Sequence, residues 1–127
     1  MSYIIFWEEK GVFVEFQDIA SGKDVIRIDD ILYSNDRFEK MKYQLWDFTK
    51  SKQLFFTDEE MEIIGVLDKS ASIWNKKMLV PIVTTDTEFI KSIEIYKKEI
   101  EGIGWVCELF SDVASARNWI KTKLTVQ

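Results

Sequence analysis

The N-terminal part of the chain carries two short apolar runs separated by polar residues. The runs YIIFW (Tyr3–Trp7) and VFVEF (Val12–Phe16) are rich in β-branched and aromatic residues, and EEKG lies between them. Such runs are typical of strands, and Gly11 can adopt the positive φ that many hairpin loops require. The pattern therefore predicts a β-hairpin.

A helical period replaces this pattern in the segment SGKDVIRIDDILYSN. Val25, Ile28, Ile31 and Leu32 lie at helical spacing behind Ser21. The Ser21 hydroxyl can accept a hydrogen bond from the first turn and so cap a helix. We expect this first helix to end at the residues SNDRF.

The rest of the chain alternates apolar runs with amphipathic segments. Strands are predicted at Tyr43–Phe48, Met78–Thr84 and Trp105–Phe110. A segment of helical period follows each strand, at residues 58–76, 86–102 and 111–124. The apolar faces expected to be buried consist of Met61, Ile64, Leu67, Ala71 and Trp74, then Phe89, Ile93, Tyr96 and Ile100, and finally Val113, Ala116, Ile120 and Leu124.

The order of these elements predicts the fold class. Strand–helix–strand repeats with short loops favour parallel pairing through right-handed crossovers, and the hairpin adds an antiparallel strand. We expect residues 1–127 to form one α/β domain with a mixed, mostly parallel sheet of about five strands and about four helices. Pro81 lies inside a predicted strand but has no N–H to donate, so we expect it at a bulge or on an edge strand.

Composition and charge narrow the function classes. The net charge of -5 repels nucleic acid and anionic lipid, so no nucleic-acid partner is expected. The absence of histidine excludes Ser–His and Cys–His catalysis, and the single cysteine, Cys107, is expected to be a small buried residue. The sequence shows neither a basic leader with an apolar core nor an apolar run of membrane length. We therefore expect a cytoplasmic location, with membrane contact at most transient.

Hydroxyl residues precede the predicted helices. Thr57 followed by Glu60 makes a capping box, and Thr85 with Glu88 repeats the spacing. Capping accounts for both threonines. Thr57 and its neighbour Asp58 also stand where a partner protein could contact the start of the helix.

Polar residues also follow the predicted parallel strands. Ligands of open α/β sheets bind beyond the carboxyl ends of such strands. We expect that edge to carry Asp47, Thr49, Thr85, Asp86, Ser111 and Asp112. No catalytic spacing, glycine-rich phosphate loop or metal-ligand cluster is visible in the sequence. We therefore predict no catalytic residue, no metal and no cofactor.

Aromatic residues make up 14% of the chain, which is more ring surface than a domain of this size must use. Core filling explains most of it. Leu54, Phe55 and Phe56 lie in a predicted loop close to Lys50 and Lys52. We expect this loop to be the place where an apolar ligand or a membrane would make contact.

Four segments, taken in succession, carry a resemblance to a known family: YQLWDFT, TDEEMEIIGVLDKSAS, VPIVTTDTEFIKSIEIYKKEIEG and WVCELFSDVASARNWI. They resemble the SpoIIAA-like proteins of the STAS superfamily, in the branch that is also compared with CRAL-TRIO folds. The resemblance covers nearly the whole chain. It implies a mixed sheet with helices packed beside it, and a non-enzymatic role.

The resemblance also implies roles for particular residues. In the anti-sigma-factor antagonists of that superfamily, a D-L-S after the central strand precedes a D-S-S-G segment whose serine is phosphorylated by a partner kinase. DFT (Asp47–Thr49) is similar to the first element, whereas no serine or glycine follows Asp58. The resemblance thus implies Thr57 as phosphoacceptor and Asp58 as a mimic of a permanent negative charge. The CRAL-TRIO likeness implies instead an apolar surface, between helices and sheet, that admits a lipid-like ligand.

These observations leave three hypotheses, in order of preference. The first is a non-enzymatic cytoplasmic binding or regulatory module that contacts a protein partner near the helix starting at Thr57. The second is a carrier or sensor of a small apolar or lipid-like ligand that associates transiently with membranes through the Leu54–Phe56 segment. The third is a carboxylate-based enzyme that uses the strand-end aspartates. The sequence does not specify the partner or the ligand, and it leaves a homodimer open.

Overall fold

The predicted N-terminal hairpin is present. In the computed structural model, which describes residues 2–125, β1 (Tyr3–Trp7) pairs antiparallel with β2 (Gly11–Phe16). Gly11 does not have a positive φ, so that prediction is wrong. The glycine permits a close approach instead, because a Cβ at this position would lie 2.5 Å from the carbonyl oxygen of Tyr43.

β2 also begins the parallel part of the sheet. Next to it lie β4 (Tyr43–Asp47), β6 (Met78–Val83) and β7 (Trp105–Phe110), and each of these strands is parallel to its neighbour. The sheet therefore has five strands in the order β1-β2-β4-β6-β7 and is mixed and mostly parallel. This confirms the predicted fold class.

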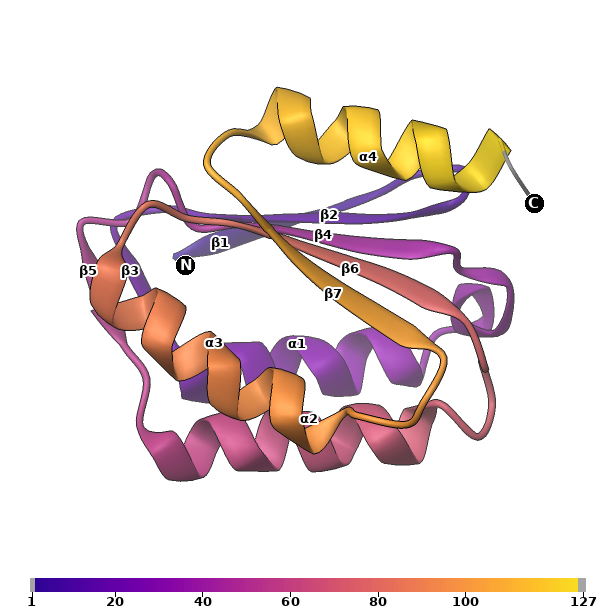
Figure 1. Ribbon diagram of the computed structural model, residues 1–127, viewed down its shortest axis with the longest axis horizontal. Coiled ribbons are helices and arrows are strands. Elements are labelled where there is room, and N and C mark those ends of the chain that lie inside the picture. The colour runs from indigo at the N-terminus through magenta and orange to yellow at the C-terminus, as the bar shows by residue number, and fades with distance from the viewer. Residues whose placement is uncertain (1, 126–127) are drawn as a thin grey trace.

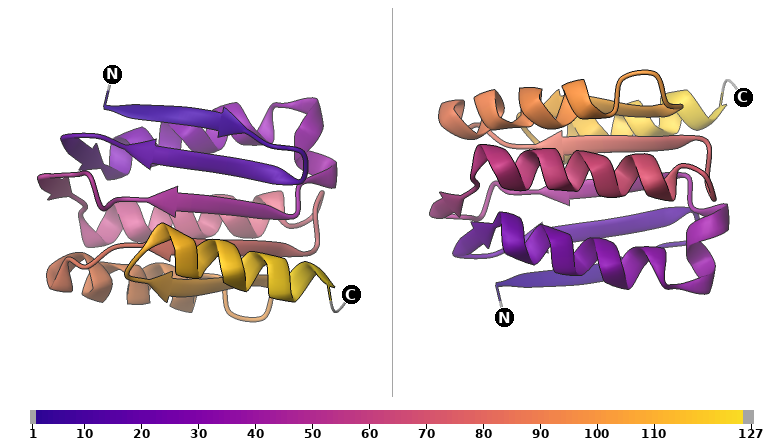
Figure 2. Two further views of the ribbon diagram at one scale, coloured as in Figure 1. Left: turned by 90° about the horizontal axis from the view of Figure 1, so that it is seen from above. Right: turned by 90° about the horizontal axis from the view of Figure 1, so that it is seen from below.

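Helices cover both faces of the sheet (Figure 1). α1 (Gly22–Tyr33), α2 (Asp58–Ala71) and α3 (Thr87–Glu99) lie on one face, and α4 (Val113–Thr125) lies on the other. Successive strand residues point to opposite faces, so the main core lies under α1–α3 and a smaller core lies under α4. Figure 2 shows that α4 leaves β1 and β2 uncovered on its side of the sheet. Within residues 2–125, no helix is both long and apolar enough to cross a membrane.

Pro81 lies in an interior strand, which contradicts both alternatives expected from the sequence. β6 has a neighbour on each side. Its register against β4 is the same before and after the proline, in the pairs Tyr43↔Leu79 and Trp46↔Ile82, so the strand has no bulge. The pairing of β4 with β6 is interrupted between these two pairs, and the interruption accommodates a residue without an N–H.

Three short elements were not predicted, and α2 and α3 end before their predicted ends. β3 (Ile19–Ser21) and β5 (Gln53–Phe55) form a separate two-stranded parallel sheet, and the 3-10 helix η1 (Asp36–Lys40) precedes β4. α2 ends at Ala71, so Trp74 is 69% exposed and is not part of a buried helix face. The other residues of the three predicted apolar faces are buried or half-buried.

Candidate functional site

The starts of α1 and α2 lie side by side. The parallel pairing of β3 with β5 places Ser21 opposite Phe55, and each strand leads into the helix that follows it. Gly22 contacts Glu60 so closely that a Cβ on the glycine would lie 2.5 Å from the Glu60 carboxylate. A groove of about 450 Å³, here called the helix-start groove, opens at this junction and is lined by Ser21, Lys23, Leu54, Phe55, Phe56, Thr57 and Glu60.

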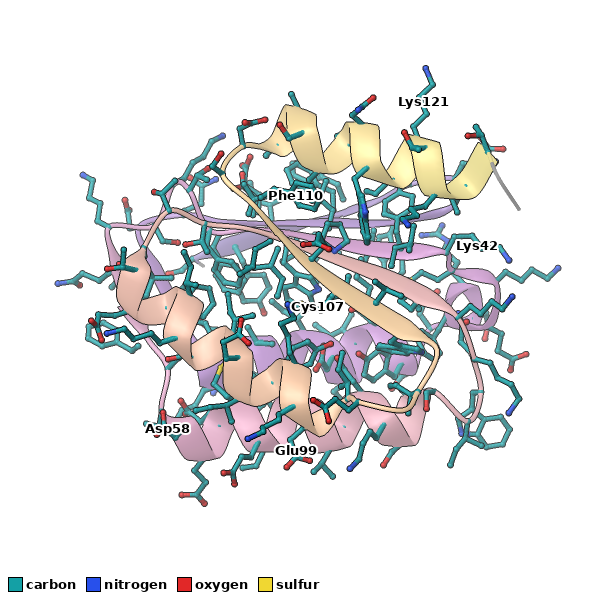
Figure 3. The ribbon with its side chains drawn as sticks, in the orientation of Figure 1. Lys42, Asp58, Glu99, Cys107, Phe110 and Lys121 are labelled. Atoms are coloured by element: carbon teal, nitrogen blue, oxygen red, sulfur yellow. The ribbon has the colours of Figure 1, made fainter. Side chains whose placement is uncertain are left out.

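Thr57 forms the predicted capping box. Its Oγ1 accepts a hydrogen bond from the backbone N–H of Glu60 at 3.1 Å, and its own N–H donates to Glu60 Oε1 at 3.0 Å. Asp58 is the first residue of α2 and lies at the outside of the molecule (Figure 3), where the positive end of the helix dipole favours its charge. Both residues are exposed, and their roles as phosphoacceptor and partner contact stay predictions.

Leu54 and Phe55 belong to strand β5, which corrects the prediction of a loop. Leu54 and Phe56 pack against the main core, and the ring centroid of Phe56 lies 4.5 Å from that of Phe89. Phe55 points outward and is 57% exposed. Phe55 is therefore the residue of this segment that is most available to a ligand or partner.

The lysines before β5 are anchored to the end of β2. Lys50 Nζ lies 2.9 Å from Glu15 Oε2. The backbone N–H of Lys52 donates to the carbonyl of Asp18 at 2.7 Å. These contacts fix the connection between β4 and β5, and the ion pair with Glu15 accounts for the charge of Lys50 without a ligand.

The first of the predicted strand-end carboxylates, that of Asp47, is hydrogen-bonded to a neighbouring residue in its own turn. Asp47 is buried at the end of β4. Its Oδ1 accepts hydrogen bonds from the backbone N–H of Thr49 at 3.0 Å and from the Thr49 hydroxyl at 2.7 Å. The two residues therefore form a turn in which the Thr49 hydroxyl donates its hydrogen bond to the Asp47 carboxylate.

Helix capping accounts for the remaining strand-end carboxylates. Asp86, and not Thr85 as predicted, caps α3 by accepting a hydrogen bond at 2.8 Å from a backbone N–H of the first turn. Asp112 accepts from the backbone N–H of Ser115 at 2.7 Å, and this hydrogen bond lowers the pKa of the carboxyl. Thr85 and Ser111 are exposed. In the described part of the chain, no three carboxylate or thiol groups lie close enough together to hold a metal ion.

A buried cluster of acidic and phenolic side chains, which the sequence pattern did not predict, joins α1, α2 and α3. Asp29 and Asp68 are only 2% and 3% exposed, and Asp29 Oδ2 has no hydrogen-bond partner within residues 2–125. The Tyr33 hydroxyl donates to Asp68 Oδ1 at 2.5 Å, and the Tyr96 hydroxyl donates to Asp68 Oδ2 at 2.6 Å. We call these four residues the buried acid cluster.

Burial raises the pKa of both aspartates in this cluster. For Asp29, desolvation is the main cause, repulsion from Asp68 adds to it, and the pKa lies well above the usual range. For Asp68, desolvation raises the pKa to about 6, while hydrogen bonds from Tyr33, Tyr96 and Asp29 oppose the rise. Both carboxyls therefore keep their protons to a higher pH than a solvent-exposed aspartate does.

A small apolar cavity of about 40 Å³ lies between the sheet and α1–α3, beside the buried acid cluster. Its walls include Phe56 but neither Leu54 nor Phe55. The volume is close to that of one water molecule, about 30 Å³. Ligand pockets measure about 300–1,000 Å³, so this cavity does not accommodate a lipid-like molecule in the present conformation.

The outward side of α2 is partly apolar. Ile63 and Val66 are exposed, and so are Ile73 and Trp74 in the turn that follows the helix. Figure 1 shows α2 as the helix farthest from the sheet. Single exposed apolar residues are ordinary, but several on one side of a helix form a candidate contact surface. We call these four residues the α2 outer surface.

Cys107 is buried in β7, as expected. Burial raises the pKa of its thiol to about 12. A thiol with so high a pKa does not act as a nucleophile at neutral pH.

Comparisons with known proteins identify the fold. No protein-family model and no curated protein matches the chain. The crystal structure of an uncharacterized DUF3478-family protein from Shewanella loihica PV-4, which has a SpoIIAA-like fold, superimposes with a TM-score of 0.51. The two sequences are 13% identical, and the match covers 93% of this chain and 91% of the other. The chain therefore has a SpoIIAA-like fold, as its resemblance to that family predicted.

Proposed function

We propose that this chain is a non-enzymatic regulatory module that binds a protein partner through α2. The observation that carries the proposal is the α2 outer surface, where four apolar side chains are exposed on the helix farthest from the sheet. Aromatic side chains are enriched and charged side chains depleted at the centres of protein interfaces. Trp74, at 69% exposure, has the character of such an interface anchor.

The helix-start groove extends this surface at the other end of α2. Thr57 lies in the groove, Asp58 follows it, and Phe55 adds an exposed ring. A phosphate on Thr57 would add negative charge beside an already acidic helix start. Such a change would alter the affinity for a partner that lies along α2.

The fold and the strand-end geometry favour this proposal over the alternatives. The SpoIIAA-like fold supports a regulatory role by analogy. The carboxylates of Asp47, Asp86 and Asp112 accept hydrogen bonds from backbone N–H groups of nearby turns and helix starts. This geometry gives no support to an enzymatic role for them. The apolar-ligand alternative needs a larger cavity than the one of about 40 Å³ under α1–α3. The cytoplasmic location stays a prediction from the sequence.

Affinity capture with charge-changing variants tests the proposal. The tagged protein and its Thr57→Glu, Asp58→Lys and Val66→Asp variants would be used to recover proteins from the native host, with quantification by mass spectrometry. We expect one protein whose recovery falls with these variants and is unchanged with Val106→Asp, a control on β7 with similar exposure. The absence of any protein whose recovery depends on α2 would contradict the proposal.

A further inference from the structure

Three exposed residues of α2, and one in the turn after it, have the spacing of a coiled-coil seam. Ile63, Val66 and Ser70 lie in α2 and Ile73 lies two residues beyond its end, and the four follow one another at intervals of three, four and three residues. This is the spacing by which one helix packs along another. The opposite side of α2 is already buried in the core of its own chain. We call these four residues the α2 seam, and their exposure indicates a place for a second helix.

The two ends of α2 carry opposite charges. The acidic residues lie in the first turns, and the basic residues lie in the last turn and just after it: Asp58, Glu59 and Glu62, then Lys69, Lys76 and Lys77. Two such helices attract one another when they run antiparallel, because each acidic end then meets a basic end. A parallel pair would place like charges together.

We propose that the α2 seam binds the α2 seam of a second copy of this chain in an antiparallel, two-fold arrangement. The inference rests on the proposed function, because it names the protein partner of the same surface. The register that aligns the two seams places Ile63 against Ile73 of the second copy and Val66 against Ser70. The contact is self-complementary, as a two-fold interface requires. The small Ser70 side chain allows the two helices to approach closely.

The charges outside the seam agree with this register. Continued in the same register, Lys76 and Lys77, which follow the end of α2, fall opposite Glu60 and Glu59 of the other copy. Lys69 lies near the two-fold axis, where it would meet its own symmetry mate. Its charge is balanced within its own chain, because Glu99 Oε2 lies 3.5 Å from Lys69 Nζ. Figure 3 shows Glu99 at the end of α3, facing α2.

A membrane surface suits this side of α2 less well than a second copy does. Amphipathic helices that lie on membranes are rich in Lys and Arg on their polar face. The first half of α2 is acidic, and the chain carries a net charge of -5. Binding of this side of α2 to lipid would therefore overturn the proposal.

Sedimentation equilibrium over a wide range of protein concentrations tests the pairing. We expect a reversible dimer whose dissociation constant rises about tenfold or more with Val66→Asp, because the new charge would be buried in the seam. The control Val106→Asp should leave the constant unchanged, since Val66 and Val106 are 49% and 46% exposed but lie on different sides of the molecule. A monomer at every concentration, or a dimer that Val66→Asp leaves intact, overturns the proposal.

Disulfide trapping tests the antiparallel register even where association is weak. Purified Val66→Cys and Ser70→Cys proteins would be mixed under mild oxidation, and the native Cys107 is buried and does not compete. We expect the mixture to form a covalent dimer faster than either variant does by itself. Faster linkage of Val66→Cys to itself would indicate a parallel register. No excess over Val106→Cys would show that the seam is not the contact.

The failure of this inference and the failure of the proposed function give different results. A monomeric chain whose recovery of another protein falls with Thr57→Glu and Val66→Asp retains the proposed function and loses the dimer. A third experiment measures whether the protein floats with vesicles of anionic phospholipid. We expect no flotation, and flotation that Val66→Asp abolishes would overturn the dimer in favour of a lipid surface.

Discussion

The Asp68 carboxyl of α2 lies close enough to Asp29 of α1 to raise the pKa of that buried carboxyl. Two neighbouring buried carboxyls disfavour the state in which both are charged. Asp68 also accepts hydrogen bonds from Tyr33 and Tyr96, so its charge is the better stabilised of the two. Asp68 of α2 is therefore linked to α1 through Tyr33 and to α3 through Tyr96.

The raised pKa of Asp68 predicts that part of the stability is lost as the pH rises. Burial raises the pKa of Asp68 in the folded state to about 6, above its unfolded value of about 3.9. The resulting contribution to stability is complete below the unfolded pKa and is lost as the pH rises through about 6. Urea unfolding at a series of pH values should show a smaller decline in the free energy of unfolding for Asp68→Asn than for the wild type. Equal declines would mean that the titration of Asp68 does not cause the loss of stability.

Removal of the phenol hydroxyls should destabilise the protein. Tyr33→Phe and Tyr96→Phe each remove a donor to Asp68. Hydrogen bonds to charged groups contribute about 1.5–3 kcal/mol, so we expect a loss of that order at neutral pH. Tyr3→Phe is the control, since the Tyr3 hydroxyl has no hydrogen bond within residues 2–125 and its removal should cost about 0.5 kcal/mol or less. Similar losses in all three variants, measured by urea unfolding, would contradict a special role for Asp68.

The two helix caps give a paired test. Asp86→Ala should destabilise the protein by about 1 kcal/mol, because it removes the side chain that accepts from the first turn of α3. Thr57→Ala should cost a similar amount through the loss of the capping box. Thr85→Ala should change the stability little, although its spacing from Glu88 resembles a capping box. A larger effect of Thr85→Ala than of Asp86→Ala in thermal unfolding would reverse the cap assignment.

Arg117 links α4 to the hairpin. Its two terminal nitrogens donate to the Glu8 carboxylate at 2.6 and 2.7 Å. The hydrogen bond from Arg117 lowers the pKa of Glu8. This contribution to stability is present above the unfolded pKa of Glu8, about 4.3, and is lost as the pH falls through the folded value. We expect Arg117→Gln to speed hydrogen exchange in α4 at neutral pH but to have less effect in acid, and a pH-independent effect would argue against the ion pair.

The larger elements were predictable because each combines a long apolar pattern with local signals. The α3 helix shows both, since Phe89, Ile93 and Tyr96 repeat at helical spacing and Gly102, with a φ of 88°, follows its end. β3 and β5 were missed because each has only three residues and depends on a partner that is distant in the sequence. The burial of Trp74 was predicted wrongly because the apolar period continues past Ala71, where the helix ends.

The buried acid cluster could be predicted only in part from the sequence. Asp29 lies four residues after Val25, and Asp68 lies four residues after Ile64, so each carboxyl falls on the apolar side of its helix. That spacing is a signal of burial. The proximity of the two aspartates depends on how α1 packs against α2, and no local pattern predicts this packing.

Photocross-linking from α2 in cells of the native host is the most direct test of a protein-binding surface on this helix. A benzophenone amino acid would replace Val66, or Val106 as the control with matched exposure. We expect a covalent adduct with a protein, either a second copy of this chain or another protein, from position 66 and not from position 106. Equal adducts from the two positions, or none from position 66, would contradict the assignment of α2 as the contact surface.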